Sequence, residues 1–302
     1  MTGTGVATVG GCRIAYRRAG TDGPPVVLLH GAGIDDATVS WRHTVDALAS
    51  EYRVYAPDWP EYGNSTGTVE HTIESYVDVL DGFLSSLPYE SVSLVGISMG
   101  GGAALGYALA NPDRVDRLGL VNSYGLGGRL PEALTWKHLS QIPGAAEFGK
   151  IAASVSNRSV RLVLNSLVAD ADALPEAFVD DVRAKLKTPR SLQAFTQFQN
   201  NELSFGGRVA TNFVDDLDSL AVPTLLVHGR RDPLVPPEWS IRAERRIPDA
   251  RLELIEDCGH WTPRERPQRF NDALLEWLPD RQCAPTIEYP DAEMPGLGSA
   301  SD

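Results

Sequence analysis

A serine stands at the centre of the pattern Gly-Ile-Ser-Met-Gly at residues 96–100. The apolar residues 92–95 before it predict a buried strand, and the small residues 101–110 after it predict a helix. A serine on so sharp a strand-to-helix turn has a strained backbone, so its neighbours two positions away must be small. The turn would place the Ser98 hydroxyl at the positive end of the helix, which stabilises developing negative charge. The pattern predicts a nucleophile, and the alternative is a glycine-rich turn without chemistry.

A second glycine-rich loop follows a predicted central strand. Residues 25–29 are a continuous apolar run, typical of a parallel strand that is covered on both faces. They lead into His-Gly-Ala-Gly at residues 30–33, where backbone N–H groups can face a ligand. We expect the N–H groups of Ala32 and Met99 to form an oxyanion hole. His30 is expected to shape this loop by hydrogen bonding and not to transfer protons.

An acid and a base follow two later strands. Residues 223–228 predict a strand that leads to Asp232, and residues 251–255 predict another that leads to His260. His260 would take the proton of Ser98, and Asp232 would orient His260 and stabilise its charged form. The order along the chain is therefore nucleophile, acid, base.

Other polar residues offer alternatives to these roles. Asp257 lies three residues before His260 and could replace Asp232 as the acid. Asn122 also follows a predicted strand but cannot supply a carboxylate. Asp58 lies in a stretch dense in turn-forming residues, so a loop-anchoring role is expected for it.

The order of strands and helices predicts an α/β fold with a mostly parallel, doubly wound sheet. We expect residues 1–122 to form the first part of the core and residues 216–279 the second part. Residues 123–215 lack a clear buried strand and predict a helical cap over the strand ends. A flexible tail is expected at residues 280–302, which are rich in Pro, Gly, Ser and acidic residues. Within the cap, helices are expected at residues 134–139, 145–154, 160–167, 176–186 and 191–201.

Composition excludes several classes of protein. The formal charge of −13 argues against nucleic acid or an anionic membrane as partner. No apolar run reaches the roughly 18 to 20 residues that span a bilayer, and the N-terminus lacks the features of a secretory signal. Three widely spaced cysteines suggest a reducing, cytoplasmic setting without a metal site. We expect a small-molecule substrate and no cofactor, and the sequence leaves open whether the protein is a homo-oligomer.

Taken together, residues 6–279 resemble the α/β-hydrolase superfamily. The matching segments are residues 30–33, 58–65, 96–101, 229–236 and 259–260. The resemblance implies a hydrolase with a Ser98–His260–Asp232 triad and an inserted cap. Related haloalkane dehalogenases and epoxide hydrolases use an aspartate as nucleophile, so a serine at position 98 excludes their chemistry.

The resemblance leaves the substrate open. The main expectation is a small, fairly apolar carboxylic ester, cleaved through an acyl-enzyme. The alternative is the carbon–carbon bond of a vinylogous diketone, because Ser-Met-Gly-Gly at residues 98–101 and Gly-His-Trp at residues 259–261 resemble the meta-cleavage-product hydrolases. Those enzymes usually have Asn where this chain has Ile97, and their His-Gly loop often continues with Gly-Pro, whereas Gly33 here is followed by Ile34, Asp35 and Asp36. Thioesterase, lactonase, amidase and perhydrolase activities stay open, as does a receptor-like protein that only binds its ligand.

Several residues are candidates for the substrate pocket. Gly31 and Gly33 flank the expected oxyanion donor, and Trp261 follows the base. Arg190 falls in the cap where the meta-cleavage-product hydrolases carry an arginine for a substrate carboxylate. Phe195 could line the acyl pocket or belong to the core of the cap. The same two interpretations apply to Trp136, Leu139, Phe148 and Phe198.

Overall fold

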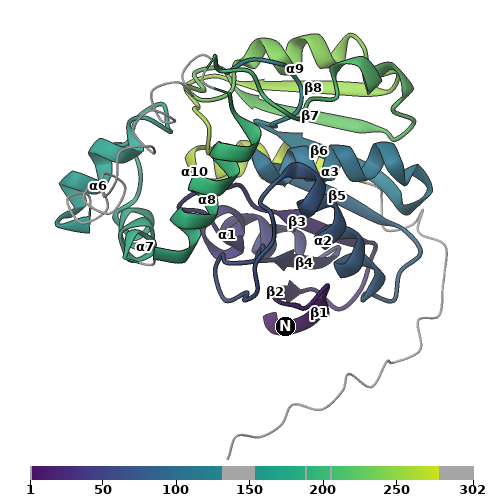
Figure 1. Cartoon of the computed structure of the whole chain (residues 1–302), viewed down its shortest axis with the longest axis horizontal. Helices are drawn as coiled ribbons and strands as arrows, with labels where there is room; N and C mark the ends of the chain where they lie inside the picture. Colours follow the sequence, from purple (N-terminus) through teal and green to yellow (C-terminus); the bar gives the residue numbers. More distant parts are fainter. Residues whose placement is uncertain (1, 131–153, 188, 205, 279–302) are drawn as a thin grey trace, which may run out of the picture.

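The computed structural model describes residues 2–130, 154–187, 189–204 and 206–278. These residues form one sheet of eight strands in the order β1-β2-β4-β3-β5-β6-β7-β8 (Figure 1). None of the described helices is long and apolar enough to cross a membrane. The strands are β1 Thr2–Val9, β2 Cys12–Ala19, β3 Pro25–Leu29, β4 Arg53–Pro57, β5 Val92–Ile97, β6 Val115–Val121, β7 Thr224–Gly229 and β8 Ala250–Ile255.

The six strands from β4 to β8 in this order are parallel, which confirms the predicted doubly wound sheet. Every residue of β3, β5 and β7 is buried, as their continuous apolar runs predict. Leu29 pairs with Gly96, and Ile97 pairs with Val121. The loops that follow β3, β5 and β6 therefore leave the sheet at the same edge, where ligands of such sheets bind.

The antiparallel edge is longer than the sequence indicates. The sequence predicts only short strands at residues 7–9 and 13–17. In the structure β1 and β2 pair along their whole length, from the Thr2–Ala19 pair to the Val9–Cys12 pair. Gly10 and Gly11 both have positive φ, at 52° and 83°, as a two-residue hairpin turn requires. Because Gly3 and Gly5 have low strand propensity, the first part of β1, before residue 7, is not recognisable from its own sequence.

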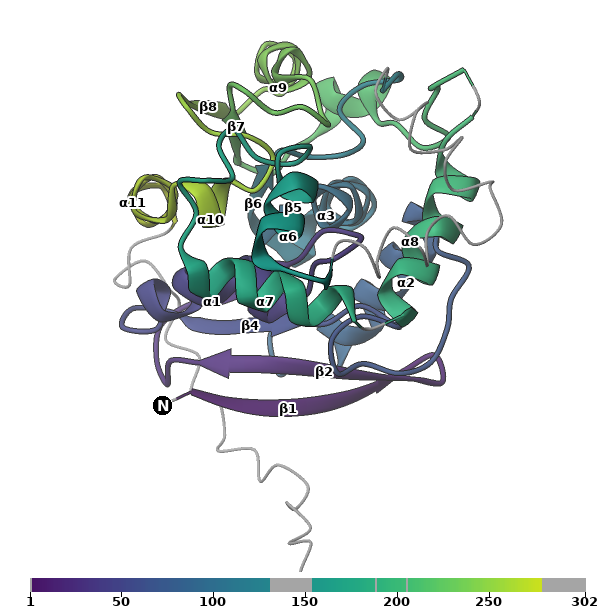
Figure 2. The ribbon, with the colours of Figure 1, turned by 90° about the vertical axis from the view of Figure 1, so that its left-hand side faces the viewer.

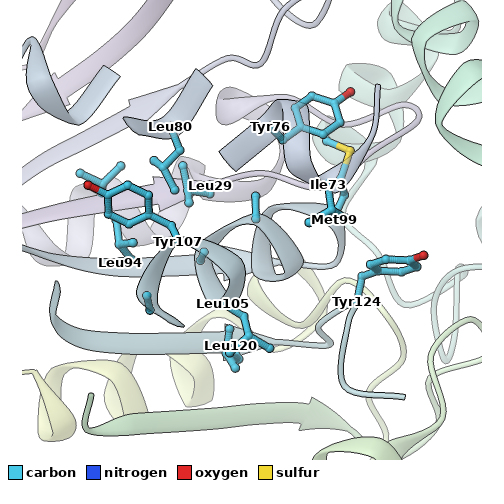
Figure 3. Packing of buried hydrophobic residues seen from close by; sticks show 14 of the residues in the cluster. Leu29, Ile73, Tyr76, Leu80, Leu94, Met99, Leu105, Tyr107, Leu120 and Tyr124 are labelled. Carbon is cyan, nitrogen blue, oxygen red and sulfur yellow. The ribbon is translucent and has the colours of Figure 1, made fainter. Parts of the chain in front are cut away.

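Helices cover both faces of the sheet and enclose two apolar cores. The first core lies against α2 (Ile73–Ser85) and α3 (Met99–Ala110), and Figure 3 shows Leu29, Tyr76, Leu80, Leu94 and Tyr107 among its buried side chains. The second lies between the opposite face of the sheet and α1 and α11. The core helices are α1 Ala37–Leu48, α2 Ile73–Ser85, α3 Met99–Ala110, α9 Pro237–Glu244, α10 Thr262–Glu265 and α11 Pro267–Trp277, with short 3₁₀ turns η1 Pro112–Arg114 and η2 Val214–Ser219.

Between β6 and β7 the described chain forms α6 Asn157–Leu164, α7 Glu176–Leu186 and α8 Pro189–Glu202. The helices expected at residues 160–167, 176–186 and 191–201 agree with these three. Figures 1 and 2, taken at right angles, place α6 and α7 beyond one end of the sheet. The helix expected at residues 134–139, most of the one at 145–154 and the tail at 280–302 lie outside the described residues. The boundaries of the cap, residues 123 and 215, stay a prediction.

Buried polar contacts join this helical segment to the core. The Glu202 carboxylate accepts hydrogen bonds from the Ile73 N–H at 2.8 Å and from the Tyr124 hydroxyl at 3.0 Å. At the other end, Lys185 of α7 pairs with Asp36, the residue that caps α1. The helical segment between β6 and β7 is thus attached to the core on both sides of the sheet edge at which the parallel strands end.

Candidate active site

Ser98 lies between β5 and α3 with φ 54° and ψ −121°, a strained conformation for a residue other than glycine. Its carbonyl accepts hydrogen bonds from the N–H groups of Gly102 and Tyr124, which hold the turn in place. A Cβ atom on Gly96 would lie 2.3 Å from the Gly100 carbonyl oxygen, and one on Gly100 would lie 2.4 Å from the Leu29 oxygen. Both flanking glycines are therefore needed because backbone approaches them closely, as the sequence pattern predicts.

Position 96 of this turn should not tolerate a side chain. Gly96→Ala should destabilise the protein by about 3 kcal/mol or more, because the added methyl group meets backbone that cannot move aside. Thermal unfolding measures the loss. Gly128→Ala is the matched control, since a Cβ atom there meets nothing within 4 Å and residue 128 is exposed. Equal stability of the two variants would contradict this account of the turn.

The predicted acid and base are in contact. His260 Nδ1 lies 2.8 Å from Asp232 Oδ2, and the two residues follow β8 and β7 as expected. Asp232 Oδ1 accepts hydrogen bonds from the N–H groups of Leu234 and Val235 at 2.8 and 3.0 Å. Because Nδ1 faces Asp232, Nε2 is the ring nitrogen that remains for the predicted proton exchange with Ser98.

Electrostatics favour a charged pair. Burial alone would raise the pKa of Asp232, but the positive charge of His260 and the hydrogen bonds of His228 and His260 hold this pKa well below its usual range. Burial alone would lower the pKa of His260, but the charge and hydrogen bond of Asp232 raise this pKa above its usual value. Asp232 is thus ionised at neutral pH and stabilises the imidazolium that a proton transfer would create.

Two further side chains hold Asp232, and the sequence predicts this role for neither of them. Asn122 Nδ2 donates to Asp232 Oδ2 at 2.7 Å and to the Gly259 oxygen at 3.1 Å, while Asn122 Oδ1 accepts from Thr262 Oγ1. His228 Nε2 lies 3.3 Å from the same Asp232 oxygen. The only signal in the sequence is their place at the ends of β6 and β7, where polar residues are unusual unless a site uses them.

The alternative acid lies away from the base. The Asp257 side chain is 77% exposed, and its carboxylate lies 3.6 Å from Arg231 Nη1. Asp58 anchors a loop, as expected, because its carboxylate accepts hydrogen bonds from the N–H groups of Ala37 and Asn64. Of the three aspartates considered, Asp232 alone contacts His260 within the described residues.

His30 occupies a structural position. Its Nε2 accepts a hydrogen bond from the Trp59 N–H at 3.0 Å, and its Nδ1 lies 2.7 Å from the Gly31 oxygen. Complete burial lowers the pKa of His30 to about 4, so the ring is neutral at physiological pH. It shapes the loop at residues 30–33, as the sequence analysis expects.

That loop lies directly beside the predicted nucleophile. A Cβ atom on Gly31 would be 3.3 Å from Ser98 Cβ. Ala32 follows, half-buried, and Met99 is the first residue of α3, where an N–H group has no partner within the helix. This arrangement is compatible with the predicted oxyanion hole, because both N–H groups belong to backbone adjoining Ser98.

The candidate pocket residues occupy different environments. The Phe195 ring lies 3.8 Å from the position of a Cβ atom on Gly33, so it lies against the loop at residues 30–33. Trp261 is buried edge-to-face against Phe178 of α7, with ring centroids 5.2 Å apart. Arg190 is exposed near the start of α8. Phe198 packs in the core against Tyr76 and Tyr124, whereas Trp136, Leu139 and Phe148 lie outside the described residues.

A buried glutamate that no sequence motif singles out fixes the segment that carries His260. Glu265 Oε2 accepts hydrogen bonds from the N–H groups of Gly259 and Ala169, and Oε1 accepts one from the Trp261 N–H. The His260 N–H itself donates to the Leu167 oxygen at 2.8 Å. Gly259 and Trp261, on either side of His260, are therefore hydrogen-bonded to one carboxylate. His260 itself is hydrogen-bonded to the chain that follows α6.

Comparisons with known proteins agree with this architecture. The family described as alpha/beta hydrolase fold matches residues 24–267. A 2-hydroxymuconate semialdehyde hydrolase of a Pseudomonas species is 30% identical over 87% of this chain and 89% of its own length. A 2-hydroxy-6-oxononadienedioate/2-hydroxy-6-oxononatrienedioate hydrolase of Cupriavidus pinatubonensis is 29% identical over 88% of this chain and 90% of its own.

Solved structures of other hydrolases are similar to this chain in fold. A meta-cleavage product hydrolase of Pseudomonas fluorescens superposes with a TM-score of 0.75 at 28% identity, covering 90% of this chain and 96% of its own. A thermophilic esterase of Thermogutta terrifontis superposes with a TM-score of 0.71 at 25% identity, covering 91% and 97%. The chain belongs to the α/β-hydrolase fold family and is a hydrolase.

Proposed function

We propose that this hydrolase uses Ser98 to cleave the carbon–carbon bond next to a ketone in a vinylogous diketone. The observation that carries the hydrolytic part is the His260–Asp232 hydrogen bond at the strand edge that also bears the strained Ser98. The choice of bond rests on the solved structure named as a meta-cleavage product hydrolase and on the two relatives named as hydrolases of 2-hydroxymuconate semialdehyde and of 2-hydroxy-6-oxononadienedioate, which match the chain over nearly nine-tenths of its length.

The proposed reaction uses only these residues and water. Ser98 Oγ bonds to the ketone carbon while His260 Nε2 takes the hydroxyl proton, and the N–H groups of Ala32 and Met99 bind the resulting oxyanion. When the carbon–carbon bond breaks, the leaving carbon keeps the electron pair in its conjugated system and takes the proton from His260. Water then cleaves the acyl–Ser98 ester with His260 as base, and releases a carboxylic acid.

Carboxylic-ester hydrolysis is the second candidate, and specific residues favour it. Ile97 is buried directly before the nucleophile, where the carbon–carbon hydrolases usually have a polar Asn. Asp35 places a carboxyl group next to the oxyanion loop, which disfavours an anionic substrate group there. The same Ser98 chemistry cleaves an ester, with an alcohol in place of the carbon leaving group.

One side-by-side assay tests both candidates. We expect kcat/KM for a vinylogous diketone carboxylate to exceed that for p-nitrophenyl acetate and butyrate by at least about tenfold, a difference of about 1.4 kcal/mol in transition-state binding. Arg190→Ala should weaken turnover of acidic diketones more than that of neutral esters, if Arg190 binds the substrate carboxylate. Equal losses of turnover for the two substrate classes would show that Arg190 does not bind the substrate carboxylate.

The other outcomes are equally informative. Ester turnover without any consumption of diketones would reject carbon–carbon cleavage in favour of the second candidate. Tight ligand binding without turnover of either class, together with no labelling of Ser98 by a fluorophosphonate, would indicate a receptor-like protein. A fluorophosphonate adduct mapped to Ser98 is expected under both hydrolytic candidates.

A further inference from the structure

A buried carboxylate lies behind the predicted oxyanion loop. Asp35 is only 5% exposed, and its Oδ2 accepts hydrogen bonds from the Gly31 N–H at 2.8 Å and from Ser40 Oγ at 2.6 Å. Its Oδ1 accepts a hydrogen bond from the Asp36 N–H at 2.8 Å. A Cβ atom on Gly31 would lie 3.2 Å from Asp35 Oδ2 and 3.3 Å from Ser98 Cβ. Only the Gly31 backbone therefore separates this carboxylate from the predicted nucleophile.

The same carboxylate is connected to the segment of the base. Ser40 Oγ, which donates to Asp35, accepts a hydrogen bond from Trp261 Nε1 at 2.8 Å. Trp261 directly follows His260 in the chain and is 5% exposed. Two hydrogen bonds through one hydroxyl thus connect the oxyanion loop with the His260 segment, which comes from the other end of the sequence.

We propose that Asp35 is a positioning residue of this active site. In its ionised form it would fix the backbone of residues 30–33 and, through Ser40, the orientation of the His260 segment. The inference rests on the proposed function in one respect, the use of Ser98 as nucleophile, and is independent of the bond that is cleaved.

The hydrogen bonds and the charges around Asp35 agree with an ionised role that titrates. All three contacts donate to the carboxylate, which favours its ionised form, whereas burial raises the pKa of Asp35 to about 7. The charged or titratable groups that interact with it are Asp36 beside it, His260 after β8, Arg264 of α10 and the Tyr62 hydroxyl. Its negative charge raises the pKa of His260, together with the charges of Asp232 and Glu265.

Asp35→Asn tests the proposal, because either orientation of the amide turns an N–H donor toward the Gly31 N–H or the Asp36 N–H. We expect kcat for a simple ester to fall about 10- to 100-fold, with KM within about threefold of wild type, since small misplacements of reacting groups cost this much. The rate of fluorophosphonate labelling at Ser98 should fall by a similar factor.

The pH profile separates positioning from general stability. In the wild type, the acid side of the pH profile of kcat/KM should approach a slope of two where both Asp35, whose pKa is raised to about 7, and His260, whose pKa is also raised, become protonated. In Asp35→Asn only His260 still titrates, so the acid side of the profile should have a slope of one. It should also move to lower pH, because loss of the Asp35 charge lowers the pKa of His260. A residue with only a structural role would change the melting temperature and leave the slope of this acid limb unchanged.

Asp36→Asn is the matched control. Asp36 is an equally buried neighbour, but its carboxylate caps α1 through the Val39 N–H and pairs with Lys185. This variant should lose thermal stability but keep a wild-type kcat and the steep acid limb of the wild type, which should move to lower pH because loss of the Asp36 charge lowers the pKa of Asp35. Should Asp35→Asn fail to fold, Ser40→Ala retains the Asp35 carboxyl group, cuts its connection to Trp261 and should lower kcat about 3- to 10-fold. Loss of the Ser40 hydrogen bond raises the pKa of Asp35, so the acid limb should move to higher pH.

Each contrary result has a definite meaning. A wild-type kcat and acid limb in Asp35→Asn, or a wild-type kcat in Ser40→Ala, would overturn the positioning role. If the wild type is labelled at Ser98 and Asp35→Asn is labelled at the same rate, only this inference fails. If the wild type is neither labelled nor active, the proposed function fails with it.

Discussion

Ser98→Ala should lower kcat/KM for every substrate by about 10⁵- to 10⁶-fold, because no other group can form the covalent intermediate. The fold should survive the change. Ser98 already holds the turn through its backbone, with its carbonyl bound by the Gly102 and Tyr124 N–H groups, and alanine differs only by the missing hydroxyl. We expect the melting temperature to change by no more than a few degrees and substrate binding to persist.

Ser93→Ala is the control for this variant. Ser93 lies on the same strand, β5, and its buried hydroxyl has no hydrogen-bond partner within the described residues. Its removal should leave kcat/KM within about twofold of wild type. Activity above about 1% of wild type in Ser98→Ala would reject Ser98 as nucleophile, since removal of a triad serine leaves far less than this.

The parts of the site that the sequence predicts depend on local constraints. The turn at residues 96–100 is recognisable because close backbone approach admits only glycine at positions 96 and 100. Asp232 and His260 could be found because each follows an apolar strand, and parallel strands deliver such residues to one edge of a sheet. The helices α6, α7 and α8 are recognisable because each has an apolar face at helical spacing.

The supporting residues could not be predicted because their roles come from contacts between distant segments. Asn122 and Asp232 are 110 residues apart, and Trp261 and Ser40 are 221 apart. Nothing in the local sequence around Asp35 or Glu265 distinguishes a buried carboxylate that accepts three hydrogen bonds from a solvated one. Their burial is decided by the docking of α1 and α10 on the sheet, which only the folded chain reveals.

The electrostatics of the acid–base pair lead to the second large effect. Asp232→Asn should lower kcat about 10⁴-fold, because an amide cannot stabilise the imidazolium and favours the wrong tautomer of His260. The acid limb of the pH profile should move to lower pH, since Asp232 is the main group that raises the pKa of His260. Steady-state kinetics between about pH 5 and 9 measure both changes.

The contribution of Asp232 to the free energy of unfolding should depend on pH. The pKa of Asp232 is depressed in the folded protein, so its ionised form stabilises the fold above the unfolded-state pKa of about 3.9, and this contribution is lost as the pH falls further. The difference in free energy of unfolding between wild type and Asp232→Asn should therefore be largest near neutral pH and shrink below about pH 4. Chemical denaturation at several pH values measures this difference.

Asp257→Asn decides whether Asp232 is the acid that the chemistry uses. Asp257 is the competing carboxylate in the sequence, but in the structure it is exposed beside Arg231. Its replacement should change the free energy of unfolding by less than about 0.5 kcal/mol and leave kcat unchanged, because an exposed ion pair contributes little. A large loss of kcat in Asp257→Asn, with near-normal activity in Asp232→Asn, would transfer the role of the acid to Asp257 and require a different arrangement of the His260 segment during catalysis.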